Sequence, residues 1–291
     1  MLPRVYESLK KQTFKRFEWV IVDDGSTDST KDLVLKWIGE LDCFFPIRYV
    51  WQENGHKKKA FNRGVIEAKG HLLVPLDSDD EAVPSALARF AELWFDIDPE
   101  IREFHSGVYC LCASPEGKVI GDEFPSDLLD SNLLEITHRY RVSGEKWVAM
   151  RTDLLRSNPY PERLTGHVPE SIVWNRISRK YAARFVNEPL RIYHSSPDSI
   201  MATGKDLMHF QGHYEWTVEI LNNELEWFWH NPLWFLKAAA NNTRFRLGGA
   251  IDASDPRFSK LNCLQKFLVK LMFPAGFLRY IVDRIRLSAS A

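Results

Sequence analysis

Short apolar runs alternate with amphipathic stretches along the first two thirds of the chain. Apolar runs bounded by turn residues are typical of buried strands, whereas apolar residues three or four positions apart are typical of helices. The pattern predicts strands over residues 17–23, 47–51, 71–76, 105–113, 118–120, 146–151, 185–187 and 190–194. It predicts helices over residues 1–11, 28–41, 58–68, 83–95 and 127–137, and others from 152 and 171. Because strands and helices alternate, we expect an α/β protein with a mostly parallel sheet and right-handed crossovers.

The rest of the chain has long amphipathic stretches rich in tryptophan, phenylalanine and leucine. The pattern predicts helices over residues 206–229, from 232, and over 261–287. Pro274 and Gly276 are expected to interrupt the last of these helices. This change of character divides the chain into an α/β domain, residues 1–203, and a helical C-terminal region, residues 204–291.

The composition is that of a globular protein, with 291 residues of which 45% are hydrophobic. The 38 basic and 39 acidic residues give a formal charge of −1, which argues against nucleic acid as a partner. Cys43, Cys110, Cys112 and Cys263 lack metal-ligand spacing, and we interpret them as reduced core residues of a cytoplasmic protein. No signal-peptide pattern and no apolar run of membrane-spanning length is present, so we do not expect an integral membrane protein.

Three carboxylates, Asp77, Asp79 and Asp80, follow the strand predicted over residues 71–76. In an open α/β sheet the carboxyl ends of the strands form the ligand crevice, so we expect these acids at its floor. Crowded carboxylates repel one another unless a cation intervenes, and a divalent ion that also holds phosphate oxygens is a common solution. The alternative is that Asp79 or Asp80 caps the following helix, whose first turn contains Pro84.

A second predicted strand also ends in acids. Asp23 and Asp24 close the strand over residues 17–23 and precede Gly25, which allows a tight turn. One of residues 26–28 can then cap the next helix. Two strands therefore bring carboxylates to the same edge of the predicted sheet.

Three blocks of sequence, VDDGSTDST, ENGHKKKAFNRGVIEAKG and LDSDD, together resemble the nucleotide-sugar-binding half of the family 2 glycosyltransferases of the GT-A fold. Their order, spacing and residue types match, and the resemblance covers about residues 1–199. It implies a GT-A-type, Rossmann-like sheet flanked by helices, to which the helical C-terminal region is appended. It also implies metal-dependent, inverting transfer of a sugar from a nucleotide diphosphate, most commonly uridine diphosphate, to an acceptor hydroxyl.

The resemblance assigns roles by position in this sequence. It implies that the nucleotide contacts are Asp23, Asp24, Asn54, Lys57, Asn62, Asp77 and Ser78. It implies that Asp77, Asp79 and His194 hold Mg²⁺ or Mn²⁺ against the donor phosphates. Asp80 is an alternative metal ligand, Asn62 alternatively has a structural role, and His194 is alternatively an ordinary loop residue.

Lys57, Lys58 and Lys59 stand at the start of the helix predicted over residues 58–68. The positive end of a helix dipole disfavours cations there, and an anionic ligand beside Lys57 would offset this cost. A solvated basic turn is the alternative interpretation.

Glu170 stands directly before the helix predicted from residue 171. The family places its catalytic base in a Glu or Asp at this point, so the resemblance implies that Glu170 is the base. Many members have Glu-Asp here, whereas Ser171 follows in this chain, which leaves Glu170 as the single candidate. The alternative is a carboxylate that only stabilises the first turn of the helix.

The family has a first apolar strand ahead of the helix that residues 1–11 predict, and the sequence lacks that strand. An empty central position would leave unpaired edges on both neighbouring strands. We therefore expect either a truncated chain or another segment in that position. A non-catalytic nucleotide-sugar-binding protein is one alternative function, and a nucleotidyltransferase, which usually carries a glycine-rich phosphate loop, is a less favoured one.

Residues 261–287 combine a run of apolar side chains with Lys266, Lys270, Arg279, Arg284 and Arg286. An apolar face flanked by cations suits a helix in the headgroup layer of an anionic membrane. The alternative is an amphipathic helix packed on the catalytic domain. Because acceptors in the family are glycans or lipid-linked sugars, we expect work in polysaccharide, lipopolysaccharide or glycolipid synthesis, with contact at the inner face of the cytoplasmic membrane.

Overall fold

The computed structural model describes residues 1–40, 43–164, 166–194, 209–252, 255–259 and 261–288. The chain divides into two compact units. The first consists of Met1–Tyr160 and Val173–Ser195, and the second of Pro161–Ile172 and Ser196–Ala291. Residues 161–172, expected within the α/β domain, thus belong to the helical unit, and the expected boundary at residue 203 lies outside the described residues.

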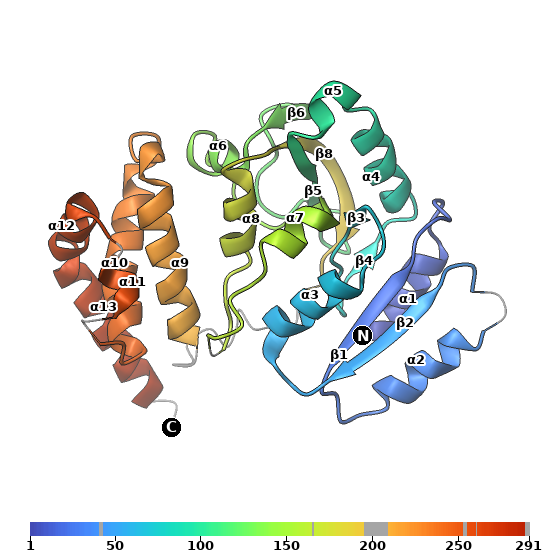
Figure 1. Ribbon diagram of the computed structural model, residues 1–291, viewed down its shortest axis with the longest axis horizontal. Coiled ribbons are helices and arrows are strands. Elements are labelled where there is room, and N and C mark those ends of the chain that lie inside the picture. The colour runs from blue at the N-terminus through green and yellow to red at the C-terminus, as the bar shows by residue number, and fades with distance from the viewer. Residues whose placement is uncertain (41–42, 165, 195–208, 253–254, 260, 289–291) are drawn as a thin grey trace. The chain divides into compact units, whose positions relative to one another are not determined.

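The first unit is a mixed α/β structure with two sheets (Figure 1). In the smaller sheet, β1 (Trp19–Asp24) pairs in parallel with β2 (Ile47–Gln52). The larger sheet contains β3 (Leu72–Leu73), β4 (Glu81–Ala82), β5 (His105–Ala113), β6 (Leu128–Ser131), β7 (Lys146–Arg151) and β8 (Ala182–Ile192). Its order is β3-β7-β5-β8-β4, with β6 also beside β8. The β5–β8 pair is parallel and the other pairs are antiparallel, so the larger sheet is mixed rather than mostly parallel.

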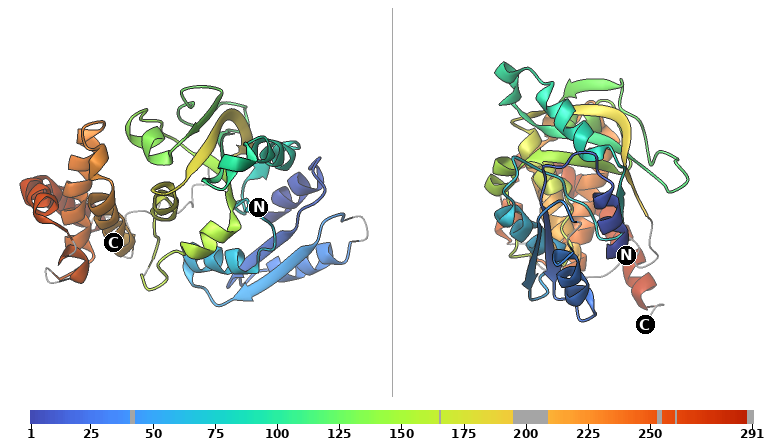
Figure 2. Two further views of the ribbon diagram at one scale, coloured as in Figure 1. Left: turned by 45° about the horizontal axis from the view of Figure 1, so that its top comes forward. Right: turned by 90° about the vertical axis from the view of Figure 1, so that its right-hand side faces the viewer.

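Helices flank these sheets (Figure 2). They are α1 (Leu2–Lys10), α2 (Thr30–Ile38), α3 (His56–Glu67), α4 (Ala86–Phe95), α5 (Pro99–Arg102), α6 (Leu133–His138), α7 (Thr152–Ser157) and α8 (Ser171–Ser178). The helix predicted over residues 127–137 is wrong in its first half, because residues 128–131 pair with β8 as strand β6. The two strands predicted within residues 185–194 are one strand, since Pro189 is accommodated at an irregularity of the β5–β8 register.

The core of the larger sheet lies between β5 and helix α4. Every residue of β5 is buried, as expected for a strand covered on both faces. Phe90 and Trp94 of α4 pack in one apolar cluster with Trp147 and with Cys110 and Cys112. These two cysteines are free core residues as predicted, whereas Cys263 is free but exposed, so its assignment to the core is wrong.

Helix α1 packs on the smaller sheet, and Gln12, just after it, binds the segment that follows Asp77, Asp79 and Asp80. Tyr6 stacks on Trp37, with ring centroids 4.4 Å apart, in a second apolar cluster. Gln12, fully buried, donates to the carbonyl of Val83 at 2.8 Å and accepts from the amide of Leu87 at 3.1 Å. Leu76, directly before Asp77, packs against this cluster and against the cluster that contains Phe90 and Trp94.

Among the residues that the structure describes, no strand pairing joins the two sheets. Within the described residues, β1 pairs with β2 alone and β3 pairs with β7 alone, so each has one edge without a strand partner.

The second unit is helical. It contains α9 (Phe210–Asn223), the 3₁₀ turn η2 (Leu225–Trp227), α10 (Pro232–Gly248), α11 (Pro256–Ser259), α12 (Cys263–Leu271) and α13 (Phe273–Ser288). Helix α9 ends at Asn223 rather than at residue 229, and residues 206–208 of its predicted start lie outside the described residues. The break predicted at Pro274 and Gly276 falls at Met272 instead, because Pro274 is tolerated in the first turn of α13.

Helix α13 packs on α10 through small and polar residues and exposes apolar ones. A Cβ atom on Gly276 would lie 2.3 Å from the carbonyl oxygen of Ala240, which shows how closely the two backbones approach. Asp283, also on this face, accepts from Arg244 at 2.9 Å. Many large apolar side chains of α12 and α13 are exposed, although Leu268 and Val269 are buried. The exposed ones are Leu264, Phe267, Leu271, Phe273, Phe277, Leu278, Ile281, Val282 and Ile285. In the described part of the chain, no helix has both the length and the hydropathy needed to cross a bilayer.

Candidate active site

Two of the predicted acids form a charge network with an arginine of β8, in which Arg191 and Asp80 are buried and Asp77 is partly exposed. Arg191 donates through Nε to Oδ2 of Asp80 at 2.7 Å, and its NH2 group lies 3.4 Å from Asp77. The network forms because β4 pairs with β8, which places Arg191 opposite Ala82, two residues after Asp80. Burial raises the pKa of Asp80 although Arg191 opposes it. Both oxygens of Asp80 are used, since Oδ1 accepts from the amide of His194 at 2.9 Å.

Lys57, in the first turn of α3, lies beside Asp77, with 2.7 Å between Nζ and Oδ1. Burial alone would raise the pKa of Asp77, but the nearby Lys57 and Arg191 outweigh it and hold the pKa below its usual value. The structure thus brings together two predicted nucleotide contacts, Lys57 and Asp77. Arg191 was missed by sequence reasoning, although an arginine between the apolar residues Leu190 and Ile192 of a strand signals a buried partner.

Asp79 is placed differently from its neighbours. Its carbonyl oxygen accepts from Arg4 at 2.9 Å, and within the described residues its carboxylate makes no hydrogen bond or ion pair. Neither Asp79 nor Asp80 caps α4, whose N-cap is Ser85, so the capping interpretation is wrong. Ser78 is exposed.

The sequence led us to expect a metal at the turn that contains Asp77 and Asp79. The described residues contain no group of three or more His, Cys, Asp or Glu side chains placed to hold a metal. The imidazole of His194 lies 2.8 Å from Glu81 through Nε2. Mg²⁺ usually takes one or two carboxylates from the protein and its other oxygens from phosphates and water. Asp79 could supply one such carboxylate, and Asp77, two residues earlier, a second one if it is released from Lys57 and Arg191.

Asp23 and Asp24, at the end of β1, are held by the neighbouring loops. Asp23 is buried and accepts from the amide of Ser26 at 2.8 Å and from Tyr49 at 2.5 Å. Burial would raise its pKa, but these hydrogen bonds outweigh burial and lower it. Asp24 accepts from the amide of Gly55 at 2.9 Å. The acids are therefore pre-positioned beside the loop that follows β2.

Gly25 and Asn54 bring these two loops together. Gly25 has a φ of +84°, and a Cβ atom there would lie 2.9 Å from the amide nitrogen of Asn54. Asn62 exchanges two hydrogen bonds with the main chain of Tyr160, at 3.1 and 2.9 Å. This arrangement corresponds to the structural alternative for Asn62.

Glu170 lies in the second unit, directly before α8. The residue that follows it, Ser171, accepts through Oγ from the indole nitrogen of Trp216 at 2.9 Å. The geometry thus places Glu170 on a segment attached to helix α9.

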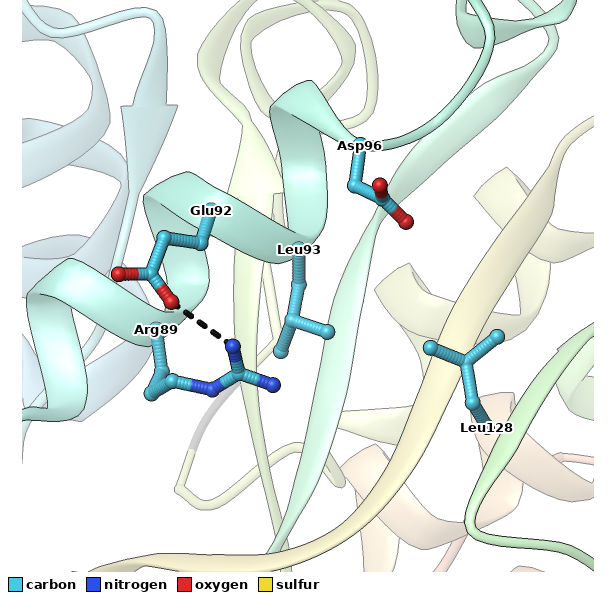
Figure 3. A pocket seen from close by; sticks show the side chains of 5 residues that line it. All are labelled: Arg89, Glu92, Leu93, Asp96 and Leu128. Carbon is cyan, nitrogen blue, oxygen red and sulfur yellow. Dashed lines mark hydrogen bonds and ion pairs between the residues drawn. The ribbon is translucent and has the colours of Figure 1, made fainter.

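A hollow of about 500 Å³ lies elsewhere in the first unit (Figure 3). Its lining is Arg89, Glu92, Leu93, Asp96 and Leu128. Arg89 lies 2.8 Å from Glu92, and Asp96 lies 2.8 Å from Arg184. Each charged residue that lines the hollow therefore has a partner of opposite charge. None of the predicted site residues lines it.

The α/β unit, with acids at the end of β1 and in the segment that follows β3, and with helices flanking its sheets, is similar to the GT-A fold. The solved structure of S. aureus TarS 1-349 in complex with UDP-GlcNAc has this fold, with a TM-score of 0.57 and 20% sequence identity. The match covers 94% of this chain and 76% of that one. Residues 1–101 match the sequence model of "Glycosyl transferase family 2". This match makes the N-terminal part of the chain similar to glycosyltransferase family 2.

Two curated relatives extend over more of the chain. One is "GalNAc(5)-diNAcBac-PP-undecaprenol beta-1,3-glucosyltransferase" from Campylobacter jejuni, 25% identical over 77% of this chain and 71% of the relative. The other is "Uncharacterized glycosyltransferase YibD" from Escherichia coli, 25% identical over 72% of this chain and 62% of the relative.

Proposed function

We propose that this glycosyltransferase moves a hexose from a UDP-linked donor to an acceptor hydroxyl with inversion, using Mg²⁺ or Mn²⁺. The observation that carries the proposal is the charge network at the strand ends. Lys57 and Arg191 neutralise Asp77 and Asp80, whereas the carboxylate of Asp79 has no such partner among the described residues. An acid left available beside a neutralised pair suits a site for a divalent ion with its diphosphate.

Each residue then has a role in the transfer. Asp23, Asp24 and Asn54 bind the nucleoside, and Lys57 neutralises charge on the diphosphate. A bound divalent ion supplies electrostatic stabilisation of the departing diphosphate. Glu170 takes the proton of the acceptor hydroxyl as its oxygen attacks the anomeric carbon, and the electron pair of the broken bond leaves with the nucleotide.

We propose a lipid-linked or glycan acceptor and a peripheral position at the inner face of the cytoplasmic membrane. The name of the C. jejuni relative, which includes undecaprenol, supports a lipid-linked acceptor. The exposed apolar face of α12 and α13 supports the position, because Lys266, Lys270 and Arg284 come from the same helices. Cations near anionic headgroups contribute about 1 kcal/mol each to such binding.

The decisive experiment is a thermal-shift screen of nucleotide sugars with and without Mn²⁺, followed by measurement of UDP release with an acceptor. A donor at a hundredfold its Kd should stabilise the protein by about 2.7 kcal/mol. Manganese-dependent stabilisation without UDP release would favour the non-catalytic binding protein. Absence of stabilisation by every nucleotide sugar would contradict both functions.

A further inference from the structure

Helix α9 is in direct contact with the segment 161–172, which carries Glu170. A Cβ atom on Gly212 of α9 would lie 2.1 Å from the carbonyl oxygen of His167, closer than any real Cβ contact. The absence of a side chain at residue 212 is therefore what lets the segment lie against the helix.

Polar and aromatic contacts from the same face of α9 hold the segment on either side of Gly212. The amide of His167 donates to Nδ1 of His209 at 3.3 Å. The ring centroids of His167 and His213 lie 6.0 Å apart. One turn further along, Trp216 donates to Oγ of Ser171 at 2.9 Å. Residues 209, 212, 213 and 216 follow the spacing of one helical face.

An ion pair fixes the start of the segment. Arg163 lies 2.8 Å from Glu215, which is itself buried and lies 3.3 Å from Arg257. Because contacts are made at residues 163, 167 and 171, the segment is attached to α9 along most of its length.

We propose that α9 positions the catalytic base, with Gly212 and Trp216 as positioning residues; this inference rests on the proposed role of Glu170. A general base must lie within hydrogen-bond reach of the proton it removes, and a displacement of about 1 Å can cost roughly 10²-fold in rate. Helix α9 therefore acts on kcat, whereas donor binding depends on the acids of the first unit.

The test compares Gly212→Ala with Gly248→Ala. A Cβ atom at residue 248 would lie 2.2 Å from the ring of Phe210, so this control crowds α9 without touching the segment. We expect Gly212→Ala to lower kcat by roughly 10- to 100-fold at unchanged donor Kd, and Gly248→Ala to lower it far less. Equal losses of kcat in the two variants, or normal kcat in a folded Gly212→Ala protein, would overturn the proposal.

A double-mutant cycle separates positioning from stability. Once Glu170→Gln has removed the base, its placement no longer matters, so adding Gly212→Ala should cost little further kcat. Additive losses would mean a merely structural role. If Gly212→Ala does not fold, Trp216→Phe replaces it in the cycle, with an expected loss of roughly threefold to tenfold from one hydrogen bond. If Glu170→Gln retains full kcat, the base assignment fails first; if only Gly212→Ala and Trp216→Phe retain it, positioning alone fails.

Discussion

Arg191 donates through Nε to Oδ2 of Asp80 at 2.7 Å, and the two side chains are almost completely buried. Removing one partner of a buried ion pair typically costs about 3–5 kcal/mol, because the other charge stays buried without compensation. We therefore expect Arg191→Met to lower the free energy of unfolding by this amount, measured by urea denaturation, and to weaken donor binding through Asp77.

Arg184 offers the matched control, since it is also a buried arginine of β8, paired with Asp130 at 2.8 Å. Arg184→Met should lose comparable stability and keep its donor affinity. Adding Asp80→Leu to Arg191→Met should restore much of the stability, because replacing both members of a buried pair is often neutral. Loss of donor affinity in both single variants would show that the effect is global.

The metal prediction concerns Asp79. Asp79→Asn should abolish manganese-dependent donor binding, measured by calorimetry, while the thermal midpoint changes little, because its carboxylate has no partner among the described residues. Asp127→Asn, at an exposed acid of the same unit, should bind donor normally. Manganese-dependent binding that survives in Asp79→Asn would remove this residue from the site.

Glu170→Gln should lower kcat by roughly 10² to 10⁴-fold with an unchanged donor Kd, since general-base assistance acts in the transition state. Glu162→Gln, on the same segment, should leave kcat within about twofold and serves as the control. If donor affinity falls together with kcat in Glu170→Gln, the residue has a structural role.

The membrane prediction uses two pairs of matched side chains. Leu278 and Ile285 of α13 are 68% and 63% exposed, and Ile66 and Phe95 of the first unit are 68% and 65% exposed. Replacing the first pair with serine should reduce sedimentation with phosphatidylglycerol vesicles, and high salt should reduce it further by screening. Replacing the second pair should have no effect. An equal effect of both pairs, or no binding by the intact protein, contradicts the proposed contact.

His213 makes the stability of the second unit depend on pH. Burial, with His167, His209 and Arg244 nearby, lowers its pKa from 6.5 to about 4. Between these values the unfolded chain binds more protons, so stability falls as pH decreases from 6.5 to 4, by on the order of 2–3 kcal/mol. The thermal midpoint of His213→Gln should lack this dependence, whereas that of His71→Gln should retain it.

The local pattern of hydrophobic and polar residues predicted many of the helices and strands. Strands β5 and β7 have the predicted bounds, because each contains a continuous apolar run, residues 108–113 and 147–150, with polar residues on both sides. Strand β6 was missed because residues 128–131 become a strand only by pairing with β8, more than fifty residues further along the chain. Sequence periodicity carries no information about such a partner.

The candidate site likewise has features that local sequence predicted and features that depend on distant strand pairing. The order of acidic blocks predicted that Asp23, Asp24, Asp77 and Asp79 lie at strand ends. The bounds of β1 agree, whereas β3 ends at Leu73, so Asp77 and Asp79 lie in the segment that follows the strand. What sequence could not reveal is which acid has an internal counter-ion. The Arg191–Asp80 pair joins positions 111 residues apart, and only the β4–β8 register brings them together.

Leu76 packs against two apolar clusters of the first unit, that of Phe90 and Trp94 and that of Tyr6 and Trp37, and immediately precedes Asp77. The position of Asp77 and of the acids after it therefore depends on the packing of two clusters rather than one. Loosening of either cluster would displace them, so heat inactivation should follow whichever cluster is the weaker and begin before the sheet as a whole comes apart. Activity would then be lost at the first local unfolding of the unit. Substitutions that stabilise only the other cluster would raise the melting temperature without lengthening the half-life of activity at high temperature.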